Sequence, residues 1–319
     1  MHSSQNSENL RYHASDPAYS GKYDVVPPPV GHRLRPLVKT YIPKKENGDC
    51  IEIGCSPGGF LTLFGDLGYT LHGIDFDPRI QNELPQWLIK NGYKPGEFII
   101  NDFTIHSFAM QYDVVYSLGF IEHFTNWADI LLRQADLVKE GGYLLIGTPN
   151  YAGFFQRLLH KLFENENYMT HVTLSMNPEL WRNLLEAIGF RVIFAGTVGA
   201  FDLWTRGTET LPRITQELLW TVEKLRPTLS AIEESSLYAM SPYLAIVAQR
   251  EIAVLPSARY ADATVRAGFE PLLAQAKQND RRTEELATTV VTELENYLRR
   301  RACLTTLLKD KLRRLLTRS

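Results

Sequence analysis

The sequence is poor in cysteine and has no long apolar run. Its 319 residues include only Cys50, Cys55 and Cys303, which form no spaced framework. This pattern argues against a disulfide-rich secreted fold and favours a reduced, cytoplasmic protein. No apolar stretch approaches the ~18 residues of a membrane span. The polar N-terminus also lacks the apolar core of a signal peptide.

A strong net charge and a metal-binding histidine motif are absent too. The formal net charge is −2, which gives no whole-chain attraction to nucleic acid or acidic membranes. The eight histidines show no spacing such as His-x-x-x-His, so we predict no metal site. Hydrophobic residues make up 44% of the chain, enough for a sizeable globular core.

Strand-like and helix-like segments alternate along most of the chain. We expect strands at 50–53, 70–74, 97–100, 112–116, 142–147, 190–195 and 242–248. We expect helices at 31–42, 59–67, 79–91, 126–139, 152–164 and 177–188. Repeated βα units of this length predict an α/β, Rossmann-like fold. Its seven-stranded, mostly parallel sheet would carry helices on both faces.

Three segments lie outside that alternation. Residues 1–44 read as an N-terminal arm followed by a helix, and about 203–240 read as a largely helical insertion. Residues 253–319 read as a helical C-terminal extension. The main domain is therefore expected over residues 45–252.

The stretch "CIEIGCSPGGF", residues 50–60, places small residues directly after a buried strand. Gly54 and Gly58 allow a sharp turn and a close approach of the backbone to a ligand. The pattern Gly-x-Ser-x-Gly departs from the dinucleotide fingerprint Gly-x-Gly-x-x-Gly. Taken alone, the stretch is explained either by a tight turn or by a ligand-binding loop.

Acidic residues mark the ends of three successive predicted strands. Asp75 follows the glycines by about 20 residues, where a carboxylate accepts both hydroxyls of a ribose. Asp102 follows the third strand, where its side chain suits an adenine amino group. Each aspartate alone is equally suited to capping a turn. Together with Glu52 on the first strand, they favour a nucleoside cofactor.

At these residues the chain resembles the class I S-adenosylmethionine-dependent methyltransferases, over roughly residues 45–250. "YDVVYSLGFIEHF" (112–124) and "LVKEGGYLLIGTPN" (137–150) are similar to motifs of the ubiquinone-biosynthesis-like O-methyltransferase subgroup. Residues 169–190 resemble the segment that follows them. The resemblance implies S-adenosylmethionine as cofactor. The cofactor-binding residues that it implies are Glu52, Gly54, Ser56, Gly58, Asp75, Phe76, Asp102, Phe103 and Ser117. In this chain Ser56 stands where the family motif has its middle glycine.

Two histidines are candidates for the chemistry. Methyl transfer to a hydroxyl requires loss of a proton, and a histidine has a suitable pKa for accepting it. His123 follows the fourth predicted strand, beside Glu122, and His171 lies before the 177–188 helix. The alternative for each is a structural histidine. Asp113, which opens the fourth strand, and Trp181 are expected to be structural.

The leading hypothesis is O-methylation of a hydroxyl on a small molecule such as a sugar, glycan or natural product. We expect the arm, the 150–175 segment and the 203–240 insertion to build the acceptor pocket. Two alternatives remain. "GCSPGGF" also resembles the loop of ribosomal RNA ribose 2′-O-methyltransferases. However, Ser117-Leu118-Gly119 stand where their catalytic Asp belongs, and no nucleic-acid partner is expected. The other alternative is a catalytically silent scaffold protein.

The last 24 residues, 296–319, are strongly basic. They carry eight Lys or Arg against one Asp, and Tyr297, Leu304, Leu308, Leu312 and Leu315 recur at helical spacing. Such a helix suits pairing in a homo-oligomer or packing on its own domain. A second role is peripheral attachment to an anionic membrane surface.

Overall fold

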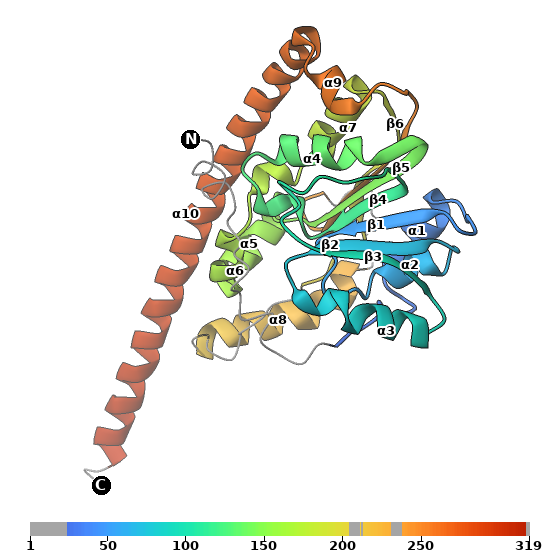
Figure 1. The fold of residues 1–319 in the computed structure, drawn as a ribbon. Coiled ribbons are helices and arrows are strands. Elements are labelled where there is room, and N and C mark those ends of the chain that lie inside the picture. Colours follow the sequence, from blue (N-terminus) through green and yellow to red (C-terminus); the bar gives the residue numbers. More distant parts are fainter. Residues whose placement is uncertain (1–23, 204–210, 212, 231–237, 317–319) are drawn as a thin grey trace, which may run out of the picture.

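A seven-stranded sheet forms the centre of the protein (Figure 1). The computed structural model describes residues 24–203, 211, 213–230 and 238–316. The strand order is β3-β2-β1-β4-β5-β7-β6, and only β7 runs antiparallel to its neighbours within the described sheet. The strands are β1 (Asp49–Ile53), β2 (Thr70–Asp75), β3 (Lys94–Ile100), β4 (Tyr112–Leu118), β5 (Val138–Pro149), β6 (Phe190–Val198) and β7 (Tyr243–Arg250). The predicted mostly parallel, seven-stranded sheet is confirmed.

Helices cover both faces of this sheet (Figure 1). One face carries α1 (Leu34–Tyr41), α2 (Leu61–Gly65) and α3 (Glu83–Lys90), which share one apolar core. The other carries α4 (Trp127–Asp136) and α7 (Pro178–Ala187), with a second core. The two cores explain why β1 and β4 are buried along nearly their whole length. Trp181 packs in the second core and donates a hydrogen bond to the Ser175 carbonyl, as expected of a structural residue.

The remaining elements lie mainly beyond the carboxyl edge of the sheet and along one side. They are η2 (Pro78–Gln81), η3 (Ile121–His123), α5 (Phe154–Phe163), α6 (Asn165–Met169), η4 (Thr173–Ser175), α8 (Arg213–Ser230), α9 (Pro256–Tyr260) and α10 (Ala263–Leu316). The prediction of one helix over 79–91 was wrong in detail. Asp77 caps a short 3₁₀ turn with its side chain on the Arg79 amide, and α3 begins only afterwards.

Asp113 lies at the amino end of β4, at the opposite edge of the sheet from the predicted site. It accepts hydrogen bonds from the Lys45 and Lys139 ammonium groups and from the Asp49 amide. Burial alone would raise its pKa, but these donors hold the pKa at about 2. The interpretation of Asp113 as structural is confirmed.

The C-terminal extension is α9 followed by the 54-residue helix α10. The first part of α10 packs against α5, α7 and η4 and buries Phe269 and Ala287. Its later part runs on past the domain (Figure 1). The basic stretch predicted at 296–319 continues this helix to Leu316. Parts of the predicted arm (1–23), insertion (204–210, 212, 231–237) and tail (317–319) lie outside the described residues.

Among the helices that the structure describes, none combines the length and apolar character required to cross a membrane.

Candidate active site

A cavity of about 540 Å³ opens at the carboxyl ends of β1, β2, β4 and β5. This is where ligands bind in open α/β sheets, because the loops diverge beyond the strand ends there. Six of the predicted cofactor residues line it: Gly54, Ser56, Asp75, Phe76, Asp102 and Phe103. Both predicted catalytic histidines, His123 and His171, line the same cavity.

The loop after β1 turns on glycines with positive φ. Gly54 has φ 75°, and a Cβ there would lie 2.7 Å from the Phe120 ring. Gly58 has φ 91°, but a Cβ there would strike Leu84 of α3, so this glycine faces the helix rather than the cavity. The loop after β1 therefore forms both a tight turn and part of the cavity border. One glycine borders the cavity, and the other allows close packing.

Ser56, at the position of the missing middle glycine, ties the loop to the end of β2. Its backbone amide donates to Asp75 Oδ2 at 2.9 Å, and its hydroxyl donates to Asp77 Oδ2 at 2.7 Å. Asp77 is also held by an ion pair with Arg79. The serine thus fixes the loop against the carboxylate that the sequence predicts to hold a ribose.

Asp75 faces the cavity as a partly desolvated carboxylate. Burial raises its pKa, although the amides of Ser56 and Asp77 donate hydrogen bonds that oppose this shift. Asp102 uses one oxygen to cap the amide of Thr104. Phe76 keeps 37% of its surface exposed beside them, which leaves an aromatic face for a base.

Three other residues predicted to bind the cofactor, Glu52, Gly58 and Ser117, do not line this cavity. Glu52 is buried and accepts a hydrogen bond from the Tyr116 hydroxyl at 2.9 Å. Burial raises the pKa of Glu52 well above its usual range. Ser117 is fully buried within β4. Residues on one strand point alternately to opposite faces, so a strand-end position in sequence does not ensure access to the site.

His123 and His171 lie together, although they come from different segments. Their ring centroids are 4.8 Å apart. His171 Nδ1 lies 2.7 Å from the Asn167 carbonyl, which can only accept, so Nδ1 carries the proton and Nε2 keeps a lone pair. Burial, together with the neighbouring His123, lowers the pKa of His171 to about 3. Burial also lowers the pKa of His123, against the opposing effect of the Thr170 and Gly119 carbonyls.

Glu122 lies beside the two histidines and is 1% exposed. Burial raises its pKa to about 8, so its carboxyl group is mainly protonated at neutral pH. One potential metal-ligand atom from each of Glu122, His123 and His171 lies within 4.8 Å of the others. No metal site is predicted from the sequence, because the eight histidines show no spacing such as His-x-x-x-His.

Sequence reasoning missed several residues of the cavity wall. His32 of the arm, Asn167 of α6 and Tyr243 of β7 all line it. The arm is held in place where the Val26 carbonyl approaches the glycine loop, since a Cβ on Gly59 would lie 2.2 Å from that oxygen. No pattern in the sequence signals these contacts. The expected wall from the arm and the 150–175 segment is present, whereas the described residues of the 203–240 insertion line no part of this cavity.

A sequence model of the methyltransferase domain matches residues 30–194, more than half of the chain. The chain belongs to this methyltransferase family. A ubiquinone biosynthesis O-methyltransferase of Shewanella pealeana is 27% identical to this chain over 125 residues, covering 37% of this chain and 52% of the relative. A "probable S-adenosylmethionine-dependent methyltransferase" of Mycolicibacterium smegmatis is 26% identical over 157 residues. The match covers 48% of this chain and 55% of that relative.

The methyltransferase thus spans about half the length of the curated relatives it matches. Among solved structures, a SAM-dependent methyltransferase from Archaeoglobus fulgidus is 21% identical, with a TM-score of 0.42 over 69% of this chain and 95% of that chain. The relative from Mycolicibacterium smegmatis is named as S-adenosylmethionine-dependent. The cavity of this chain fits that cofactor, because Asp75 offers a carboxylate for ribose hydroxyls and Gly54 leaves room at the loop. Membership of a methyltransferase family favours an enzyme over a silent scaffold.

Proposed function

We propose that this methyltransferase O-methylates a hydroxyl of a small molecule, with the proton passing to His123. The observation that carries the proposal is the pair of imidazoles beside Asp75 and Gly54 in one cavity. When bound, S-adenosylmethionine supplies a methyl group activated by its sulfonium. The protein aligns the methyl donor with the acceptor, and such alignment lowers the activation barrier by roughly 7–11 kcal/mol. It also supplies a base for the departing proton.

His123 suits the role of proton acceptor better than His171. Its protonated form would donate to the carbonyls of Thr170 and Gly119, which both favour the charged ring. Protonation of His171 is opposed by burial and by His123 itself. His171 keeps its Nε2 lone pair and would orient the acceptor by accepting a hydrogen bond from a second donor group on it, since the reacting hydroxyl gives its one proton to His123.

The lining of the cavity supports a small acceptor over RNA. Among the described residues that line it, there is no Lys or Arg to pair with a phosphate backbone. Ser117, Leu118 and Gly119 occupy the end of β4, where the RNA enzymes place their catalytic Asp. The O-methyltransferase relative from Shewanella pealeana also favours a hydroxyl acceptor.

The test is identification of the product by mass spectrometry after incubation with S-adenosylmethionine and a panel of hydroxylated metabolites and sugar nucleotides. A methyl ether formed by the protein, and not by its His123→Ala variant, would support the proposal. Methylation confined to amines, or to RNA in a parallel incubation, would contradict it.

A further inference from the structure

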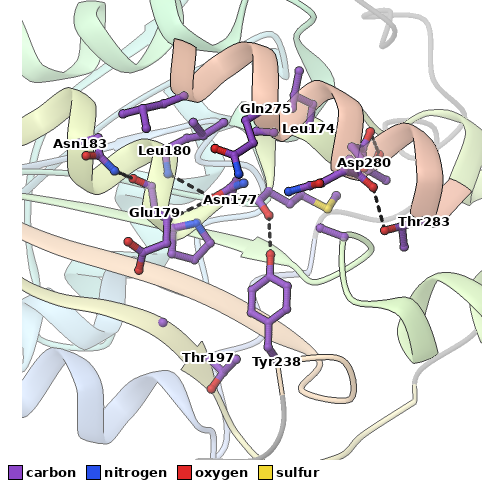
Figure 2. A pocket seen from close by; sticks show the side chains of 18 residues that line it. Leu174, Asn177, Glu179, Leu180, Asn183, Thr197, Tyr238, Gln275, Asp280 and Thr283 are labelled. Atoms are coloured by element: carbon purple, nitrogen blue, oxygen red, sulfur yellow. Dashed lines mark hydrogen bonds between the residues drawn. The ribbon is translucent and has the colours of Figure 1, made fainter. Parts of the chain in front are cut away.

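A second cavity, of about 690 Å³, lies between α7, the end of β6 and α10 (Figure 2). It shares no lining residue with the cofactor cavity. The two are neighbours, since His171 lines the first and Thr173, two residues on, lines the second. Tyr238 of the insertion and six residues of α10 contribute to its wall, so two additions to the fold build it. Its size lies in the range of small-molecule sites, about 300–1,000 Å³.

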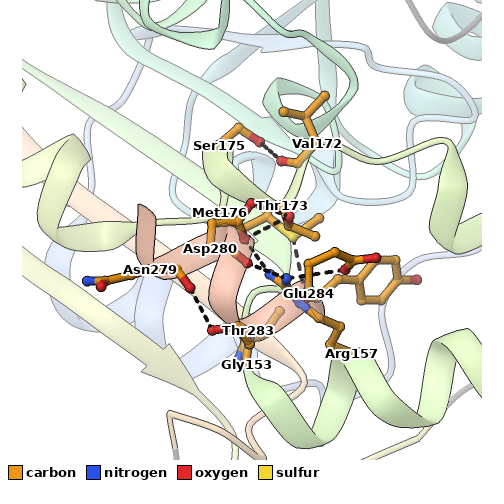
Figure 3. Close-up of polar contacts among 12 residues, drawn as sticks. Gly153, Arg157, Val172, Thr173, Ser175, Met176, Asn279, Asp280, Thr283 and Glu284 are labelled. Atoms are coloured by element: carbon orange, nitrogen blue, oxygen red, sulfur yellow. Dashed lines mark hydrogen bonds and ion pairs between the residues drawn. The ribbon is translucent and has the colours of Figure 1, made fainter. Parts of the chain in front are cut away.

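The α10 wall of this cavity is fixed by buried charge (Figure 3). Arg157 of α5 is fully buried and forms ion pairs with Asp280 and Glu284 of α10. The Thr173 hydroxyl donates to both oxygens of Asp280, at 2.9 and 3.0 Å. Lys161 donates to Glu284 from the same side. The cavity is therefore bounded by a helix that is tied to the domain at several points.

Carboxamides and hydroxyls dominate the polar lining. The carboxamides come from α10, from the start of α7 and from within it: Asn177, Asn183, Gln275 and Asn279. The hydroxyls come from Thr173, Thr197, Thr283 and Tyr238. A carboxamide offers both donors and an acceptor, which matches an alcohol group that also donates and accepts. Within the described chain, the side chains of Gln275 and Asn279 have no hydrogen-bond partner and remain available to a ligand.

The charge balance of the lining favours an uncharged ligand. No Lys, Arg or His is among the described lining residues, so a phosphate or carboxylate would find no cation there. Asp280 is already paired with Arg157. The remaining carboxylate, Glu179 in the first turn of α7, is itself exposed to solvent and lies 3.8 Å from Arg182.

Apolar groups alternate with these polar ones. Leu174, Leu180 and Leu272 line the cavity, and the Tyr238 ring stands in its wall with the hydroxyl directed to the Met176 carbonyl (Figure 2). A saccharide presents both hydroxyls and apolar C–H faces. We propose that this second cavity binds an uncharged carbohydrate, which is either a remote part of the methyl acceptor or a separate saccharide.

The experiment is a glycan array probed with the fluorescently labelled full-length protein in the presence of saturating S-adenosylhomocysteine, followed by titration of a retained glycan. Gln275→Leu combined with Asn279→Leu should weaken binding by about tenfold or more, since each lost hydrogen bond contributes a few-fold. Gln278→Leu is the matched control, because this glutamine is exposed on the same helix but does not line the cavity.

Retention of uncharged glycans that is lost in the double variant and kept in the control would support the proposal. No retained glycan, retention of anionic glycans only, or equal binding by the double variant would overturn it. Incubating a retained glycan with S-adenosylmethionine then separates the two sources. Gain of a methyl group identifies it as the acceptor, and no gain identifies a separate ligand. Because binding is read without methylation, this test is independent of the proposed function.

Discussion

The imidazole rings of His123 and His171 lie 4.8 Å apart, centroid to centroid, on the wall of the cofactor cavity. The segments that carry them are joined by a backbone hydrogen bond from Val172 N–H to the Glu122 carbonyl, 2.7 Å long. The His123 ring contacts the carbonyl of Thr170, just after α6, and the His171 ring contacts that of Asn167, within α6. The relative position of the two rings is therefore set by the backbone and does not depend on a bound ligand.

Replacing His123 by Ala should lower kcat by about 10²-fold or more, because a general base contributes about 10²–10⁴-fold. Cofactor affinity should stay nearly unchanged. His171→Ala should raise KM for the acceptor more than it lowers kcat, if this ring only orients the acceptor molecule. His106→Ala, a histidine outside the cavity lining, is the control for both. Steady-state kinetics with the identified acceptor decides the roles, and a large loss of kcat in the His171 variant alone would reverse them.

Replacing Asp75 by Ala should weaken binding of S-adenosylmethionine by roughly ten- to a hundredfold. Hydrogen bonds to a charged acceptor contribute about 1.5–3 kcal/mol. The carboxylate also anchors the Ser56 amide, so part of the loss will come from a looser loop. Isothermal titration calorimetry measures the change, with Asp129→Ala, an exposed carboxylate on α4, as control. Equal affinities of a folded Asp75 variant and the control would exclude the predicted ribose contact.

Glu122 should make the protein less stable as the pH rises from about 4.5 to about 8. Its folded-state pKa is raised to about 8, so in that range the folded state binds more protons than the unfolded state. The free energy of unfolding should then fall by up to about 1.4 kcal/mol per pH unit from this group. Denaturant unfolding measured between pH 5 and about 9 should show a smaller decrease in the free energy of unfolding for Glu122→Gln than for the unchanged protein. Parallel curves for the two proteins would show that Glu122 ionises normally in the fold.

Removing the partners of Arg157 should detach α10. In Asp280→Asn combined with Glu284→Gln, a fully buried guanidinium loses both counter-charges. The cost should be about 3 kcal/mol, the lower end of the usual range, because both carboxylates are partly exposed. Glu285→Gln is the control, since this neighbour pairs only with exposed Arg281 among the described residues. Denaturant unfolding and limited proteolysis of α10 provide the measurement, and equal stability of the double variant and the control would contradict the anchoring role.

The projecting end of α10 should mediate self-association. The stretch 296–319 is basic. Its described part, up to Leu316, continues an anchored helix beyond the domain (Figure 1). We expect a chain ending at Arg300 to have a lower oligomeric mass by sedimentation than the full chain, while cofactor binding is kept. Truncation at Pro256 is unsuitable, because it would also expose Arg157. Salt-sensitive binding to anionic vesicles, without a change in mass, would favour the membrane-surface role instead.

The sequence by itself predicted the sheet, and its resemblance to a known family predicted the cofactor. Alternating βα segments, the glycine loop and an acid at the end of β2 are local patterns, each written within a few consecutive residues. Gly54, Asp75 and Phe76 could therefore be placed from the sequence, because the strand that each one follows already fixes its edge of the sheet.

Tertiary structure decided which side chains reach the cavity and which ionisable groups have shifted pKa values. Glu52 and Ser117 stand at the predicted strand ends, yet their side chains point into the core. His32 and Tyr243 line the same cavity although they lie far apart in the sequence. The pairing of His123 with His171 and of Arg157 with α10 depends on contacts between distant segments. Such contacts follow from how the helices pack, and packing depends on the shape of the whole core rather than on any local pattern.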